Sequence, residues 1–121
     1  MDKFAIDGHK MQYHTERKNQ WLSAKTQEEK LNVFPIYVEI SPVGHCNHRC
    51  TFCAVDYIGY KPRILSTPNL KTVLKEMAQC GVKSVMFAGE GEPLLHKELA
   101  EVILYAKEVG LNSAITTNGT M

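Results

Sequence analysis

Apolar residues occupy every second position between Ile36 and Ile40, and more polar residues fill the positions between them. This period of two is typical of a β-strand whose two faces have different surroundings. Glu39 should therefore point away from the apolar face, toward a barrel lumen or into a structural hydrogen bond. The turn-forming stretch Ser41-Pro42-Val43-Gly44 predicts the end of the strand.

The next apolar pattern has the period of a helix. Thr67-Pro68 is typical of a helix start, with a hydroxyl at the N-cap and proline at the first helical position. Apolar residues then recur at helical spacing up to Gly81, which can supply a left-handed C-cap. The residues on this face are Leu70, Val73, Leu74, Met77 and Cys80. We expect Cys80 to be a core residue rather than a ligand.

The same unit then repeats. Residues 84–88 form a short apolar run typical of a buried parallel strand, and a second helical pattern covers residues 96–109. Residues 113–117 predict a third strand that ends at Asn118-Gly119. The order strand–helix–strand–helix–strand predicts an α/β fold of parallel βα units with right-handed crossovers.

The first third of the chain has a different character. Residues 15–30 are polar, rich in helix formers and free of glycine and proline, so we expect one or two short helices there. Trp21 and Leu22 are candidates for docking such a helix onto the rest of the protein. We interpret residues 1–34 as an N-terminal helical extension and residues 35–121 as the main domain.

Three of the four cysteines lie directly after the first predicted strand. Cys46, Cys50 and Cys53 have the spacing C-x3-C-x2-C. Three thiolates so close in sequence can converge on one metal centre, but they are one ligand short of a tetrahedral zinc site or an ordinary four-cysteine cluster. An iron–sulfur cluster held by these three cysteines would keep one iron open to another ligand.

This spacing, with Phe52 directly before the third cysteine, resembles the motif of the radical S-adenosylmethionine (SAM) enzymes. The resemblance implies that Cys46, Cys50 and Cys53 hold a [4Fe–4S] cluster and that the methionine part of SAM binds the fourth iron. It implies reductive cleavage of SAM to a 5′-deoxyadenosyl radical, which abstracts hydrogen from a substrate that the sequence does not identify. It also places Phe52 against the adenine.

The stretch Gly89-Glu90-Gly91-Glu92-Pro93 follows the second predicted strand. It resembles the family's glycine-glycine-glutamate-proline segment, which receives the methionine amino group of SAM. The match falls on Gly91, Glu92 and Pro93, and Glu90 replaces the first glycine of the usual pair. Taken alone, the same stretch also fits a plain strand-to-helix turn that is capped by acids.

Thr116-Thr117-Asn118-Gly119 ends the third predicted strand and is similar to the family's polar segment near the carboxylate and ribose of SAM. The resemblance implies that Thr117 and Asn118 contact SAM. It also implies the first half of a partial TIM-type (βα)6 barrel. All three motifs follow strands, and the carboxyl ends of strands form the catalytic rim of such barrels.

The composition narrows the function further. A net charge of +1 without a basic stripe argues against a dedicated nucleic-acid surface, and no apolar run is long enough to span a membrane. Nothing indicates export, so we expect the protein in a reducing cytoplasm. The resemblance also implies an electron donor such as flavodoxin or ferredoxin.

Three strands would expose a sheet edge to self-association or a partner. We therefore expect the chain to be a fragment, inactive by itself.

Two alternatives remain open at the level of the sequence. His45 or His48 can complete a Cys3His zinc site on paper, although His48 lies in the three-residue gap between two thiols. The chain would then be a non-catalytic zinc or iron–sulfur module. A half-barrel completed by a partner chain is the other alternative.

Overall fold

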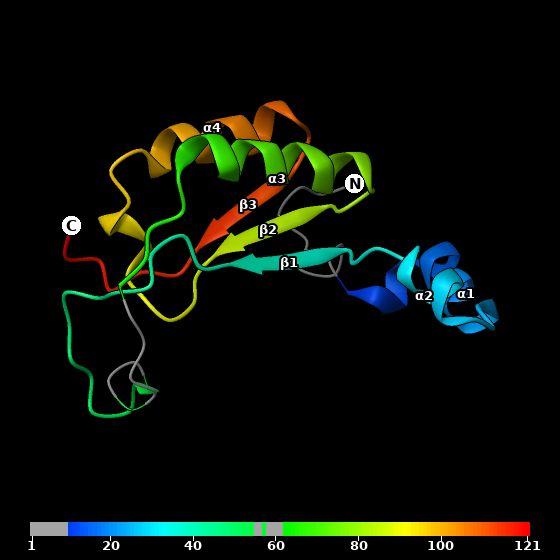
Figure 1. Cartoon of the computed structure of the whole chain (residues 1–121), viewed down its shortest axis with the longest axis horizontal. Helices are drawn as coiled ribbons and strands as arrows, with labels where there is room; N and C mark the ends of the chain where they lie inside the picture. The colour runs from blue at the N-terminus through cyan, green and yellow to red at the C-terminus, as the bar shows by residue number, and fades with distance from the viewer. Residues whose placement is uncertain (1–9, 55–56, 58–61) are drawn as a thin grey trace.

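Three parallel strands form one sheet in the computed structural model, which describes residues 10–54, 57 and 62–121. They are β1 (Tyr37–Ile40), β2 (Ser84–Phe87) and β3 (Asn112–Ile115), in the spatial order β1-β2-β3. Figure 1 shows the three strands side by side, with α3 (Thr67–Gln79) and α4 (Leu99–Glu108) on the same face of the sheet. The predicted α/β fold of parallel βα units is confirmed.

Short helices precede the sheet, as predicted. They are the 3₁₀ helix η2 (Met11–Tyr13) and the α-helices α1 (Thr15–Ser23) and α2 (Gln27–Leu31). Thr26 and Glu29 form a reciprocal capping box at the start of α2, which satisfies two backbone donors. Residues 1–9 of the predicted extension lie outside the described residues, and the domain boundary at residue 34 stays a prediction.

Arg17 connects α1 to the rest of the protein through hydrogen bonds, and the predicted docking residues Trp21 and Leu22 are partly exposed. Trp21 is 50% exposed and Leu22 is 68% exposed. The guanidinium of Arg17 donates instead to the carbonyl oxygen of Phe34, before β1, and at 3.5 Å to that of Cys80, after α3. Backbone carbonyls before β1 and after α3 therefore contact this helix, and the docking role of Trp21 and Leu22 stays a prediction.

The helix α3 begins one residue away from its predicted cap. Ser66 is the N-cap, and its hydroxyl accepts from the backbone of Asn69 at 3.4 Å. Thr67 is buried, and its hydroxyl donates to the carboxylate of Glu98 just before α4. The hydroxyl of Thr67, which the local sequence pattern predicted to cap the helix, therefore binds Glu98 instead, a residue distant in the sequence.

The second predicted helix begins later than expected. A 3₁₀ helix, η4 (Pro93–Leu95), precedes it, and α4 begins at Leu99, three residues after the predicted start at residue 96. His96 separates them with an extended backbone, and its buried ring places Nε2 2.8 Å from the carbonyl oxygen of Leu65. The strand β3 also ends early, since its predicted last residue, Thr117, donates instead to Glu92.

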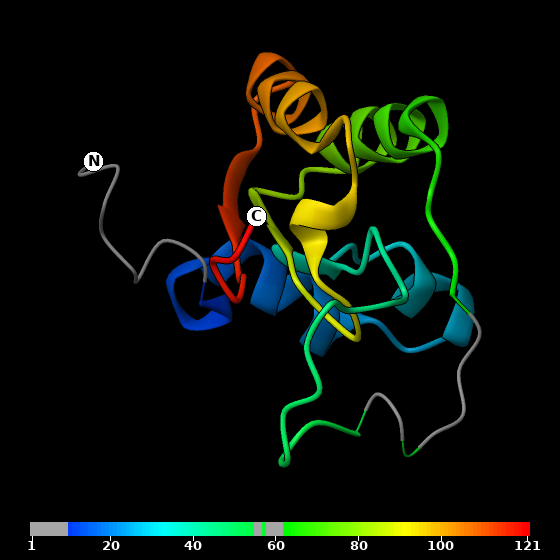
Figure 2. The same cartoon turned by 90° about the vertical axis from the view of Figure 1, so that its left-hand side faces the viewer.

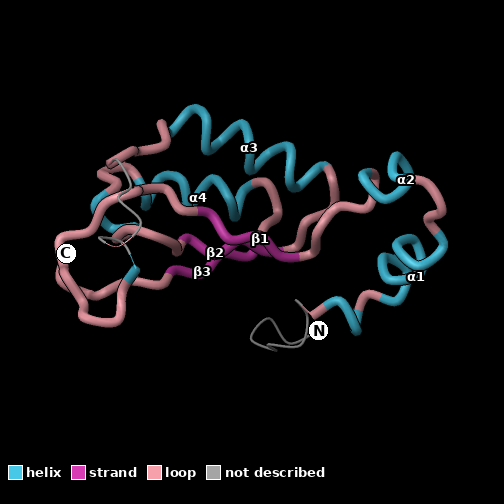
Figure 3. Tube along the Cα trace, turned by 60° about the horizontal axis from the view of Figure 1, so that its bottom comes forward, coloured by secondary structure: helices cyan, strands magenta, loops and turns pink. Residues whose placement is uncertain are grey.

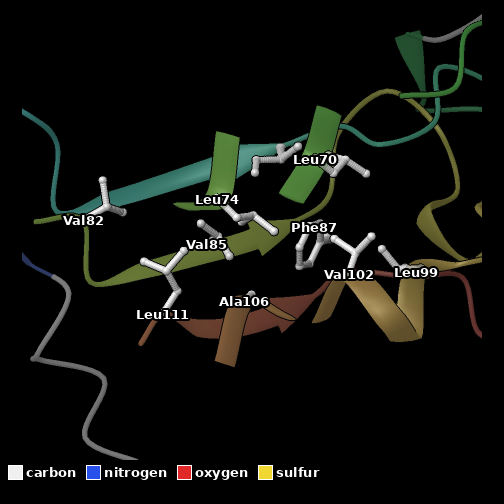
Figure 4. Packing of buried hydrophobic residues seen from close by; sticks show 10 residues of the cluster. Leu70, Leu74, Val82, Val85, Phe87, Leu99, Val102, Ala106 and Leu111 are labelled. Atoms are coloured by element: carbon white, nitrogen blue, oxygen red, sulfur yellow. The ribbon is translucent and has the colours of Figure 1, made fainter. Parts of the chain in front are cut away.

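The core lies between the sheet and the two helices α3 and α4. Figure 4 shows Leu70 and Leu74 of α3 above Val85 and Phe87 of β2, with residues of α4 packed beside them. The buried members of this cluster are Ile40, Leu70, Leu74, Val82, Val85, Phe87, Leu99, Val102, Ala106 and Leu111. The predicted apolar face of α3 is confirmed at Leu70, Leu74 and Met77, but Val73 is 40% exposed and Cys80 is half-buried and outside this cluster.

This core fixes the direction of the strands and therefore the place of the loops. All three strands end at the same edge of the sheet, from which the cysteine loop, the Gly89–Pro93 segment and the segment after β3 emerge (Figures 1 and 2). The helices α1 and α2 lie at the opposite end of the sheet (Figure 3). None of the helices in the described part of the chain is long and apolar enough to cross a membrane.

Candidate cofactor site

The loops after β1 and β2 touch each other through their backbones. The amide of Glu92 donates to the carbonyl oxygen of His45 at 3.0 Å. A Cβ atom added to Gly91 would lie 2.1 Å from the carbonyl oxygen of Val43, far inside a normal contact distance. Glycine is therefore needed at this position so that the segment after β2 can approach the chain that leads into the cysteine loop.

Glu92 joins the segment after β2 to the segment after β3. Its side chain is buried, and Oε1 accepts from the hydroxyl of Thr117 at 2.6 Å and from the amide of Leu94 at 3.0 Å. Oε2 accepts from the amide of Asn118 at 2.8 Å. The carboxylate thus caps η4, as the plain turn reading required, and also gathers the two polar residues that the resemblance assigned to SAM.

The surroundings of Glu92 favour its ionised form. Burial by itself raises the pKa of the carboxyl group. The hydrogen bonds from Asn118, Thr117 and Leu94, together with the charge of His48, outweigh burial, so that the pKa lies below its ordinary value. The site therefore contains a buried negative charge at neutral pH.

Asn118 extends these contacts to the cysteine loop. Its side-chain amide donates to Oδ1 of Asn47 at 2.9 Å and lies 3.7 Å from Sγ of Cys46. Asn47 lies between two residues of the cysteine motif but is not itself part of the predicted site. Sequence reasoning missed it because an asparagine in a loop has no periodicity that would reveal its partner.

The three cysteines of the motif are free thiols on the loop after β1. Cys46 is half-buried, and its Sγ accepts from the amide of His48 at 3.4 Å, whereas Cys50 and Cys53 are exposed. Within the described residues, no three His, Cys, Asp or Glu side chains are placed to hold a metal ion. The structure thus brings Cys46 to the polar cluster but does not gather the three sulfur atoms, whether for an iron–sulfur cluster or for a Cys3His zinc site.

The other predicted residues have mixed positions. Pro93 is buried at the start of η4, while Phe52 is 91% exposed. Cys80 is a half-buried free thiol at the C-cap of α3, at the end of the sheet away from the other cysteines. Glu39 is exposed and accepts a hydrogen bond from Tyr37 at 2.7 Å, which confirms its structural alternative.

The chain belongs to the radical SAM superfamily, whose family model matches residues 40–121. This match covers the last residue of β1, the strands β2 and β3, the helices α3 and α4, and the loops that follow the three strands. The enzymes of this family use a [4Fe–4S] cluster and SAM. The predicted family is confirmed, and the predicted cofactors are those of the family.

Curated relatives resemble the chain over the same region. A GTP 3′,8-cyclase of Vibrio atlanticus (strain LGP32) is 40% identical over 91 residues, which are 69% of this chain and 26% of that protein. An S-adenosylmethionine-dependent nucleotide dehydratase of Lacinutrix mariniflava is 36% identical over 80 residues, 62% of this chain and 17% of that protein. The chain therefore spans about a quarter or less of the length of these two relatives.

A solved structure has the same fold. The Streptococcus suis protein SuiB, in a crystal structure with S-adenosylmethionine bound, superposes with a TM-score of 0.65 over 92% of this chain and 30% of its own chain. The two sequences are 20% identical. This likeness supports the assignment of the three-stranded sheet to part of a radical SAM barrel.

Proposed function

We propose that Cys46, Cys50 and Cys53 hold a [4Fe–4S] cluster at the carboxyl edge of this sheet. The donor set fits the group, since three free thiols on one loop suit a cluster whose fourth iron takes an outside ligand. The observation that carries the proposal is the contact between this loop and the buried carboxylate cluster around Glu92, through Asn118. A plain structural turn does not require that contact.

SAM is the proposed ligand of this carboxylate cluster. Oε2 of Glu92 accepts a hydrogen bond from the amide of Asn118, and a carboxylate oxygen has a second lone pair for the ammonium of a methionine group. Thr117 and Asn118 add polar groups beside it, and Gly91 and Pro93 shape the segment that carries it. Phe52 is proposed to cover the adenine from the cysteine loop.

When bound, the cluster would supply the electron for reductive cleavage of SAM, and SAM would supply the 5′-deoxyadenosyl radical that abstracts hydrogen from an unidentified substrate. The residues of this chain bind and orient both cofactors. An external reductant such as flavodoxin or ferredoxin is required, and free thiols together with a cluster suit a reducing cytoplasm.

We do not transfer a substrate from the relatives. Those that share this segment include a GTP 3′,8-cyclase and an S-adenosylmethionine-dependent nucleotide dehydratase. Because two differently named activities share it, we propose that the segment carries the common cofactor chemistry. The choice of substrate would then depend on parts of those proteins outside the match.

Anaerobic reconstitution tests the proposed function. The chain should bind about four irons and four sulfides and show the broad thiolate-to-iron absorption of a [4Fe–4S] centre. SAM should then change the electron paramagnetic resonance spectrum of the reduced cluster. Replacing Cys46, Cys50 or Cys53 with alanine should abolish iron binding, because each removes a ligand.

Cys80→Ala is the matched control, since this thiol lies at the other end of the sheet, and it should bind iron like the wild type. Stoichiometric zinc without iron uptake would overturn the proposal in favour of a zinc module.

A further inference from the structure

Three side chains connect the cysteine loop to the last described segment of the chain. Nδ2 of Asn47 donates to Oγ1 of Thr120 at 2.9 Å, and Nδ2 of Asn118 donates to Oδ1 of Asn47 at 2.9 Å. Oγ1 of Thr120 in turn donates to Oδ1 of Asn118 at 2.7 Å. Asn47, Asn118 and Thr120 therefore form a closed ring of hydrogen bonds, here named the Asn–Asn–Thr ring.

The ring has a single consistent direction. Each of its three side chains donates one hydrogen bond to the next and accepts one from the previous one, so no donor faces a donor. Hydrogen bonds arranged head to tail polarise one another and are stronger together than alone. The ring therefore connects two loops that are more than seventy positions apart in the sequence, through side chains that are exposed.

Asn118 links the ring to the proposed cofactor site. Its backbone amide is held by Glu92 at 2.8 Å, and its side-chain amide lies 3.7 Å from Sγ of Cys46. The ring thus gives a side-chain connection between the first proposed cluster ligand and the proposed SAM-binding residues.

We propose that Asn47 and Thr120 are positioning residues for the cofactor site. They act through Asn118, holding Cys46 in place against the Thr117–Asn118 segment in the chain without cofactors. The assignment rests on the proposed function for the identity of the cofactors, but the coupling between the two loops can be measured without them.

The test is the alkylation rate of each cysteine in the anaerobic, cluster-free chain, measured with N-ethylmaleimide and peptide mass spectrometry. Thr120→Val removes the hydroxyl at constant shape and breaks two of the three ring bonds. It should speed the labelling of Cys46 about three- to tenfold, the range expected from losing one or two hydrogen bonds. Cys50 and Cys53 are already exposed and should change less than about twofold, serving as internal references.

Two further variants keep the test decisive. Thr120→Ser retains the hydroxyl and should label like the wild type, whereas Asn47→Ala should reproduce the acceleration from the other side of the ring. Unchanged Cys46 rates in both Thr120→Val and Asn47→Ala would overturn the proposal, as would equal acceleration in Thr120→Ser. A wild-type chain that takes up no iron would instead overturn the proposed function, because labelling is read before any cluster is added.

Discussion

Glu92 shows how one side chain serves the fold and the proposed chemistry together. Its carboxylate is buried and accepts hydrogen bonds from two different segments of the chain. The glycine-and-glutamate spacing predicted an acid at this edge of the sheet. The spacing did not predict that Thr117 and Asn118 would be its partners, because this pairing depends on the parallel register of β2 and β3.

Glu92→Gln should destabilise the chain at neutral pH by about 1–3 kcal/mol, since the amide group would place a donor opposite the Asn118 amide or the Thr117 hydroxyl. The lowered pKa of Glu92 gives this loss a pH dependence. The stabilisation is fully present above the ordinary pKa of 4.5 and is lost as the pH falls through the lower, folded-state value. The difference between variant and wild type in urea unfolding should therefore shrink below about pH 4.5.

Glu90→Gln is the control for this measurement. Glu90 is the exposed acid two positions earlier in the same segment, so its substitution should change the free energy of unfolding by less than about 0.5 kcal/mol. A Glu92→Gln chain with the stability of the control would show that the carboxylate is not needed to hold the two segments.

At the scale of elements, the sequence predicted what depends on periodicity and missed what depends on distant contacts. The period of two in β1 and the helical spacing in α3 and α4 predicted the buried faces, because one core covers all of them. The start of α3 was misplaced because Thr67 donates to Glu98, and α4 was shortened because His96 is held by Leu65. The cysteine loop has no period, so its fold could not be derived.

Gly91→Ala should be among the most destabilising single changes in these loops. The added methyl would meet the backbone carbonyls of Val43 at 2.1 Å and His45 at 2.5 Å, and backbone cannot move aside as a flexible side chain can. We expect a loss toward the upper end of about 1–3 kcal/mol in the free energy of unfolding, measured by chemical denaturation. Lys97→Ala, an exposed change on the same connection, should stay within about 0.5 kcal/mol. A stable Gly91→Ala chain would mean that the two loops separate at little cost.

At the scale of the whole molecule, the sheet has helices on one face, and β1 and β3 are its two edge strands. The helices α3 and α4 cover one face, while all four residues of β3 are exposed. The matched relatives are several times longer than this chain, so the activity of a whole enzyme cannot be read from this segment. The segment does contain the three proposed cofactor loops. They meet at the carboxyl ends of the strands because all three strands run in the same direction.

The exposed edge of β3 leads to a prediction about the chain in solution. Unpaired backbone groups at a sheet edge favour pairing with a second copy, so we expect concentration-dependent self-association in size-exclusion chromatography with light scattering. The amides of Asn112 and Thr116 donate toward β2 at 3.0 Å, so by alternation the amide of Ser113 points outward. Ser113→Pro removes that outward donor without touching the ladder to β2, and it should shift the chain toward the monomer. Ser113→Ala keeps the donor and should associate like the wild type. A wild-type chain that stays monomeric and unfolds cooperatively at high concentration would show that the β3 edge is protected without a partner.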